Sequence, residues 1–288
     1  MNAINRSSLK DRLKSYARSP LSLVLFLLVC LAAVATFATL LFLVGYILIK
    51  GIPYLTPELF SWTYTSDNVS MMPAIISTLI MTALSLLIAA PLGIFAAIYL
   101  VEYAKRGNKI VGLVRITAET LSGIPSIVYG LFGMLFFVTQ LKWGYSILSG
   151  SFTLSIMILP LIMRTTEEAL KSVPDSFREG SFGLGAGRLR TVIRIVLPSA
   201  VPGILAGVIL AVGRIVGETA ALMYTAGTVA KVPKGVLDSA RTLAVHMYAL
   251  SNEGLNTNQA YATAVVLLLI VISINWLSGF IAKRIAKG

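Results

Sequence analysis

The run LSLVLFLLVCLAAVATFATLLFLVGYILI, residues 21–49, contains no Asp, Glu, Lys or Arg over 29 positions. A hydrocarbon core about 30 Å thick is crossed by about 20 apolar helical residues, so this run is long enough to span a membrane. It is about twice as long as the apolar part of a secretory signal peptide, and no small-residue cleavage site precedes polar sequence. We therefore expect it to remain in the protein as the first transmembrane helix.

The rest of the chain has the same apolar character. Of its 288 residues, 57% are hydrophobic and 12% are charged, whereas about a quarter of the residues in a soluble domain are charged. This composition predicts an all-α membrane protein with a cytoplasmic N-terminal tail over 1–20 and a transmembrane domain over 21–283. We expect six transmembrane helices, at residues 21–49, 71–101, 117–140, 145–166, 198–222 and 258–282.

The net charge of +12 is distributed unevenly between the two sides of these helices. Eighteen of the 24 Lys and Arg residues lie in the N-terminal tail, the 102–119 loop, the 164–194 loop and the C-terminal tail. Five lie in the opposite loops, and the last, Arg214, lies inside a span. Basic loops stay in the cytoplasm, so both termini are expected there. This topology accounts for the basicity, and nucleic acid is not expected as a partner.

Two ionisable residues interrupt the fifth apolar run, AVGRIVGETAALMY at 211–224. An arginine at the bilayer centre costs about 2.5–3.5 kcal/mol on insertion scales, and such residues usually face a water cavity or the bundle interior. Arg214 lies sixteen residues after Pro198, which is about 24 Å along a helix. Its guanidinium has the donor geometry to bind oxyanions. We therefore expect Arg214 in an anion pathway.

Glu218 follows Arg214 by four residues, so in a continuous helix the two side chains would share one face and could pair. Two interpretations fit this spacing. Glu218 either satisfies Arg214 only while the pathway is empty, or it forms a permanent structural pair with Arg214. We include Glu218 among the expected pathway residues.

The third span begins with ETLSGIPSIVYGLFG, residues 119–133. Gly123 and Pro125 should kink or break this helix, and broken backbone at membrane depth is tolerated where protein or a water cavity satisfies it. The hydroxyls of Thr120, Ser122 and Ser126 could donate hydrogen bonds to an anion at the break. Serine and threonine are also common between packed membrane helices, so a structural role is the alternative.

Arg164 follows the apolar run SIMILPLIM at the cytoplasmic end of the fourth span. It is a further pathway candidate. The alternative is that its guanidinium extends to the lipid headgroups, as arginines at the ends of membrane helices often do.

No residue pattern points to catalysis or to a bound metal. The chain has one cysteine, Cys30, and one histidine, His246, and one histidine cannot build a metal site. No G-x-x-x-x-G-K-[ST] phosphate loop is present, and GLGAG at 183–187 is not followed by Lys-Ser/Thr. We expect a non-enzymatic chain without a cofactor of its own.

The 164–197 cytoplasmic loop contains DSFREGSFGL, which favours a short helix, and a spaced motif. The motif runs Glu-small-small, three residues, Gly, nine residues, Ile, one residue and Leu-Pro, and its members are Glu179, Gly180, Ser181, Gly185, Ile195, Leu197 and Pro198. It resembles the EAA loop of ABC-importer permeases, with Gly180 and Ser181 in place of two alanines. The resemblance implies that residues 175–198 form a coupling loop, whose short helix docks into a groove of a separate ATPase subunit.

Five further stretches extend the resemblance across nearly the whole chain: PLGIFAAIYLVEYAK (91–105), residues 119–133, LPLIMRTTEEALKSVP (159–174), GRIVGETAALMYTAG (213–227) and RTLAVHMYALSNEG (241–254). They are similar to the PstA-type permeases of the bacterial phosphate-specific ABC transporter. The resemblance implies the type I ABC importer permease fold, phosphate import and a location in the bacterial inner (plasma) membrane. It implies as partners a PstC-type permease, two PstB-type subunits that bind ATP and Mg, and an extracytoplasmic phosphate-binding protein.

Two alternatives are compatible with parts of the sequence. The same machine could carry another oxyanion, such as sulfate or molybdate, because the Arg/Glu pair alone does not exclude them. An ion-coupled secondary transporter or channel could use that pair as a gate, but it gives no reason for the EAA spacing.

Overall fold

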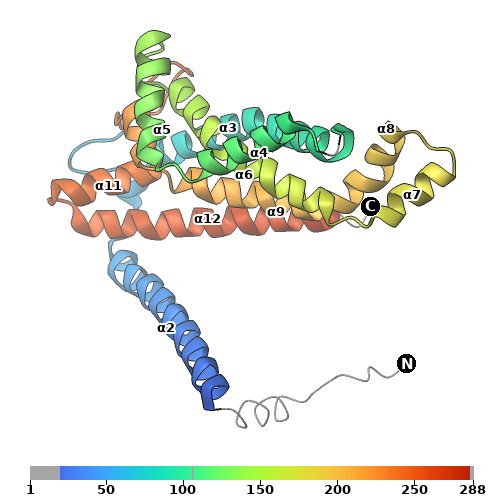
Figure 1. Ribbon diagram of the computed structural model, residues 1–288. Coiled ribbons are helices and arrows are strands. Elements are labelled where there is room, and N and C mark those ends of the chain that lie inside the picture. Colours follow the sequence, from blue (N-terminus) through green and yellow to red (C-terminus); the bar gives the residue numbers. More distant parts are fainter. Residues whose placement is uncertain (1–19, 106, 286–288) are drawn as a thin grey trace. The chain divides into compact units, whose positions relative to one another are not determined.

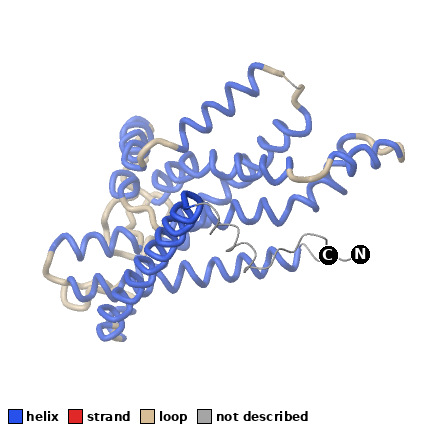
Figure 2. The backbone as a smooth tube through the Cα atoms, turned by 60° about the horizontal axis from the view of Figure 1, so that its bottom comes forward, coloured by secondary structure: helices blue, strands red, loops and turns tan. Residues whose placement is uncertain are grey.

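The computed structural model of the chain describes residues 20–105 and 107–285, so the expected N-terminal tail falls almost entirely outside the described residues. The described residues form helices joined by loops and contain no strand (Figure 2). The α-helices are α2 (Pro20–Gly51), α3 (Met72–Ile98), α4 (Lys109–Ser122), α5 (Ser126–Gly133), α6 (Ile147–Lys171), α7 (Asp175–Gly183), α8 (Arg188–Thr191), α9 (Leu197–Val216), α10 (Ala220–Thr225), α11 (Leu243–Glu253) and α12 (Thr257–Ile285). The 3₁₀-helices are η1 (Ile52–Tyr54) and η2 (Pro57–Phe60), and the π-helical segments are η3 (Tyr99–Tyr103), η4 (Met134–Gln140) and η5 (Val192–Val196).

The chain divides into two compact units, residues 1–50 and residues 51–288. The described part of the first unit, residues 20–50, lies entirely in α2, a helix whose apolar side chains are largely exposed. A helix with apolar side chains all round is suited to a lipid environment. Five helices of the described residues are long and apolar enough to cross a membrane, and α4 with α5 adds a sixth if the bent pair is one span.

The second unit is a helical bundle, in which α6 and α9 run lengthwise with α12 beside α9 (Figure 1). The short helices α7 and α8 lie at one end of it, and α11 lies toward the other (Figure 1). Fully buried Met81, Leu154 and Ile158 form part of the core between α3 and α6. In this core Ser85 Oγ donates to the carbonyl of Ser151 at 3.2 Å, and Ser155 Oγ donates to that of Ser85 at 3.2 Å. Small polar residues let membrane helices approach closely, so α6 is held firmly in place.

The expected break in the third span is confirmed. The helix α4 ends at Ser122, α5 begins at Ser126, and the two helices meet at an angle of 101°. Pro125 has no N–H to donate and Gly123 has low helix propensity, which explains why the helix is interrupted over residues 123–125. Figure 1 shows α5 leaving the direction followed by α4.

The fifth span differs from the helix expected at 198–222. The chain is helical from Arg188 through η5 to Val216, so the helix starts ten residues earlier, and Pro198 stands in the first turn of its α9 part. It also ends six residues earlier, because Gly217 closes α9 and a new helix, α10, starts at Ala220. At 1.5 Å per residue, the 29 residues from Arg188 to Val216 cover about 43 Å.

His246 is fully buried at the start of α11, outside the membrane-spanning helices. Burial, and after it the positive charge of Arg241, lower the pKa of its imidazole to about 4, against the opposing effect of a backbone hydrogen bond with Val69. Arg241 Nη1 lies 3.3 Å from His246 Nδ1. Since a guanidinium only donates, Nδ1 accepts and the ring is neutral. These contacts support a structural role for His246.

Acid should therefore destabilise the segment around α11. Below the ordinary histidine pKa of about 6.5, His246 is protonated in the unfolded segment but stays neutral in the folded one. The free energy of unfolding therefore falls as the pH drops from about 6.5 to about 4. The loss amounts to roughly 3 kcal/mol, at 1.36 kcal/mol per pKa unit. Hydrogen exchange of α11 measures it, and His246→Asn, which keeps an acceptor for Arg241 but does not titrate, should remove this dependence. An unchanged acid sensitivity in that variant would contradict the assignment.

Candidate translocation and coupling sites

The break between α4 and α5 satisfies much of its exposed backbone internally. The Gly123 N–H donates to the Thr120 carbonyl at 3.1 Å, and the Ile124 N–H donates to that of Leu121 at 3.1 Å. The Tyr129 hydroxyl reaches back from α5 and donates to the same Leu121 carbonyl at 2.7 Å. Membrane helices can be interrupted where other protein groups replace the lost hydrogen bonds, and Tyr129 stabilises this interruption.

The three hydroxyls expected at this break differ in what they contact. Thr120 Oγ1 donates to the Ile116 carbonyl and Ser122 Oγ to the Glu119 carbonyl, each at 2.8 Å and each within α4. Thr120 is exposed, and Ser122 and Ser126 are half-buried. To donate to a passing anion, the hydroxyls of Thr120 and Ser122 would have to rotate away from their carbonyls.

A second break, between α9 and α10, places Glu218. Its carboxylate Oε1 accepts a hydrogen bond from the Ala221 N–H at 3.0 Å, and only 8% of the residue is exposed. Glu218 thus caps the start of α10, where free N–H groups and the helix dipole favour a negative charge. The expected pair with Arg214 is not formed, because the helix ends at Gly217 and the four-residue spacing no longer puts the two side chains on one face. In the part of the chain that the structure describes, the ion pairs do not include Arg214.

The two breaks adjoin each other. Helix α5 packs against α10 so closely that a Cβ added to Gly130 would lie 2.8 Å from the Ala221 Cα. The half-buried Arg214, three residues before Gly217, lies in the neighbourhood of Tyr129 of the first break. The structure thus brings a guanidinium without an ion-pair partner to the junction of two interrupted membrane helices. Sequence reasoning did not identify Tyr129, since an isolated tyrosine in an apolar run gives no signal of its contacts.

Arg164 belongs to a different group of charges, between α4 and α6. Its Nη1 lies 3.8 Å from Glu119 and its Nε 3.3 Å from Glu168. The neighbouring Glu167, which sequence reasoning also missed, is buried. The six charged residues here line a cavity of about 240 Å³ and carry three positive and three negative charges: Arg115, Glu119, Arg164, Glu167, Glu168 and Lys171.

Glu167 is the centre of this group. Its Oε1 lies 2.7 Å from Arg115 Nε and 2.6 Å from Lys171 Nζ. Arg115 thus attaches α4 to the C-terminal end of α6, where Lys171 of the same helix shares the buried carboxylate. Arg164 pairs with Glu119 and Glu168, and Arg214 is outside the ion pairs of the described residues, so these two candidates stand in separate sites.

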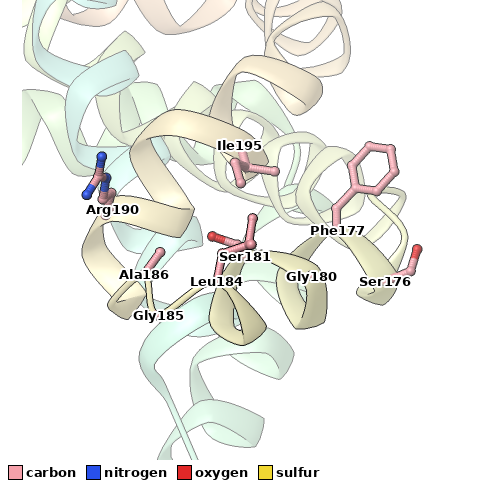
Figure 3. A pocket seen from close by; sticks show the side chains of 9 residues that line it. All are labelled: Ser176, Phe177, Gly180, Ser181, Leu184, Gly185, Ala186, Arg190 and Ile195. Atoms are coloured by element: carbon pink, nitrogen blue, oxygen red, sulfur yellow. The ribbon is translucent and has the colours of Figure 1, made fainter.

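The coupling motif forms a helix, a turn and a second helix, as Figure 3 shows. Helix α7 carries the first half of the motif, Gly185 makes the turn with a φ of +81°, and α8 follows. The Ser181 hydroxyl lies 2.8 Å from that of Thr191, and both residues are buried. A small residue is needed at position 181 because it faces inward onto α8.

Glu179 and Gly180 are exposed, and a Cβ added to Gly180 would meet nothing within 4 Å in this chain. Gly180, Ser181, Gly185 and Ile195 help to line an open hollow of about 520 Å³ (Figure 3). Leu197 is half-buried and Pro198 exposed, on the helix that leaves the loop. Large apolar side chains stand exposed on the same loop: Phe177, Phe182, and Leu184, which is 90% exposed. Exposed apolar patches of this kind mark interaction surfaces.

No group of three or more His, Cys, Asp or Glu side chains that could hold a metal occurs among the described residues.

The known proteins that this chain resembles are permease subunits of transporters. Residues 89–287 match the family described as "Binding-protein-dependent transport system inner membrane component". The chain is 34% identical over 281 residues to the "Probable ABC transporter permease protein YqgI" of Bacillus subtilis, covering 89% of this chain and 94% of that protein. It is 34% identical over 261 residues to the "Phosphate transport system permease protein PstA 2" of Mycobacterium bovis, covering 87% and 86%.

Among solved structures, a bacterial alginate ABC transporter in complex with its pentasaccharide-bound periplasmic protein superposes with a TM-score of 0.66 at 18% identity, covering 91% of this chain and 96% of that one. At this identity the likeness shows the fold.

Proposed function

The chain belongs to the family of binding-protein-dependent transport system inner membrane components, and from that premise we propose that it forms half of the membrane pathway of an ATP-driven importer of inorganic phosphate. As a member of this family it is a multi-pass inner-membrane permease subunit of an ABC importer, and the family is not catalytic. The phosphate specificity and the detailed assembly are the proposal.

Phosphate is supported first by relatives named as phosphate permeases, among them PstA 2 of Mycobacterium bovis. The observation that carries the proposal is the position of Arg214, beside two broken helices and outside the ion pairs of the described residues. A guanidinium stays protonated at every physiological pH and donates in a fork that fits phosphate. Arg214 can therefore bind a passing oxyanion without first breaking a salt bridge.

The cap formed by Glu218 suggests that Glu218 and Arg214 have different roles where the two breaks meet. Glu218 holds the start of α10 through the Ala221 N–H, so it fixes the break next to Arg214 and does not neutralise the guanidinium directly. A conduit must also release its ion. A single cation with a buried carboxylate nearby suits transient binding better than a cluster of cations would.

We propose the following assembly. Both termini lie in the cytoplasm, as the distribution of basic residues indicates. A PstC-type permease completes the pathway, a binding protein delivers phosphate at the outer face, and two PstB-type subunits bind ATP and Mg. The EAA-like loop docks on one of these ATPases, since Phe177, Phe182 and Leu184 are exposed beside the motif. Closure of the ATPases then switches the permease pair between inward- and outward-facing states.

Reconstitution tests the cargo and the class of transporter together. We consider liposomes that contain this chain with its partner permease, the ATPases and the binding protein. They are expected to take up labelled phosphate only when ATP is supplied on the side of the membrane where the ATPases are bound. Uptake of sulfate or molybdate with no uptake of phosphate would replace the substrate. Anion transport by the chain alone, without ATP, would favour a secondary transporter or channel and overturn the importer.

A further inference from the structure

The coupling helix α7 has few backbone neighbours. Among the described elements, its backbone packs closely against α8 and η5, which are part of the same loop and the helix that follows it. A movement of α7 therefore reaches α9 directly through the chain. Its connection to the other side of the bundle, where α3 ends in η3, depends on side chains.

A largely buried arginine of α7 makes such a connection. Arg178 of α7 places Nη2 2.7 Å from Glu102 Oε1, and its Nε donates to the same carboxylate at 3.2 Å. Glu102 lies in η3, 76 residues earlier in the chain. The side chain of Arg178 is 14% exposed and that of Glu102 is 8% exposed. A guanidinium that binds a carboxylate with two donors fixes orientation as well as distance.

The same guanidinium also fastens α7 to the end of α6. Nη1 donates to the Val173 carbonyl at 2.7 Å and Nη2 donates to the Leu170 carbonyl at 2.9 Å. These carbonyls belong to the last turn of α6 and the residues just after it, where backbone acceptors lack helical partners. A fourth partner, Asp175, lies 3.2 Å from Nη1 but is 71% exposed.

The elements joined in this way are parts of the bundle. Helix α3 packs against both α6 and α9, and α9 carries Arg214 near its far end. We propose that Arg178, through its buried contact with Glu102, transmits the movement of the coupling helix to α3 and α6. Arg178 is a positioning residue: it moves helices together and does not touch the transported ion. This inference rests on the proposed function, because it gives the route by which ATP hydrolysis would reach the pathway.

The test compares the buried and the exposed partner of Arg178 in the reconstituted complex. Glu102→Gln keeps the size of the side chain and removes its charge, whereas Asp175→Asn does the same to the exposed carboxylate. Three quantities are measured: copurification of the ATPase subunit, ATP hydrolysis, and phosphate taken up per ATP hydrolysed.

With Glu102→Gln, the ATPase should remain bound and active, and uptake per ATP should fall about tenfold, the size of effect that residues on a coupling route produce. With Asp175→Asn, uptake per ATP should stay within about twofold of wild type, because an exposed ion pair contributes little. Arg178→Lys keeps the charge but loses the fork, and should reduce uptake per ATP at least as much as Glu102→Gln. The double variant Glu102→Gln, Arg178→Lys should be no worse than Arg178→Lys alone, because both changes break the same link.

Two results would overturn the proposed link. The first is normal uptake per ATP in Glu102→Gln. The second is loss of the bound ATPase in that variant, which would make the pair structural. A wild-type complex that couples ATP hydrolysis to a different anion would overturn only the phosphate assignment, because the same ratio measured with that anion still decides the role of Arg178.

Discussion

Replacing Arg214 with glutamine is expected to lower phosphate uptake by about a hundredfold, because a charge-assisted hydrogen bond is worth up to roughly 3 kcal/mol. The amide keeps a similar length and some donor capacity but loses the charge and the fork. The helices around position 214 should stay intact, since the guanidinium is not part of an ion pair in the described residues. ATP-driven uptake of labelled phosphate measures the effect, and copurification of the partner subunits confirms assembly.

Two control variants test whether the loss of uptake is specific to Arg214. Lys231→Gln removes an exposed cation from the segment between α10 and α11, and should leave uptake near wild type if a general positive potential is not the cause. Glu218→Gln keeps an oxygen that can accept the Ala221 N–H, so its uptake should also stay close to wild type. Normal uptake in Arg214→Gln would return Arg214 to a structural role, and loss of uptake in Glu218→Gln would make the charge of Glu218 part of the transport cycle.

Replacing Gly180 with tryptophan is expected to separate the permease from its ATPase and to abolish ATP-driven uptake. A side chain at position 180 points into open space in this chain, so the fold of the loop should tolerate it. In the assembled importer the same indole would occupy the face on which we propose that the ATPase docks, and overfilled contacts cost typically 1–3 kcal/mol, occasionally more. Copurification of the ATPase with the permease gives the first readout, and ATP-dependent uptake gives the second.

Gly180→Ala is the matched control. The methyl group meets nothing within 4 Å in this chain, and the loops that the motif resembles carry alanine here, so binding and uptake should stay within about twofold of wild type. If the tryptophan variant retains the ATPase and transports phosphate normally, the exposed face of α7 is not the docking surface.

The sequence predicted the features that depend on residues close together in the chain. Long runs without charged residues predicted the membrane helices, because hydropathy is a property of each segment by itself. The break at Gly123 and Pro125 was predictable for the same reason, since proline removes a backbone donor wherever it stands. The stretch DSFREGSFGL predicted a short helix in the loop that carries the EAA-like motif, and α7 is found there.

The partners of the charged side chains were decided by the tertiary structure. From four-residue spacing, Glu218 was expected beside Arg214, but the helix ends between them and Glu218 binds Ala221 instead. Arg178 meets Glu102 across 76 residues, and no local pattern could indicate that pair. The sequence by itself therefore determined which segments enter the membrane and where the coupling loop lies. Only the packing of distant helices decided that Arg178 is paired with Glu102 and that Arg214 stays outside the ion pairs of the described residues, because ion pairing depends on distances between segments that the local sequence does not encode.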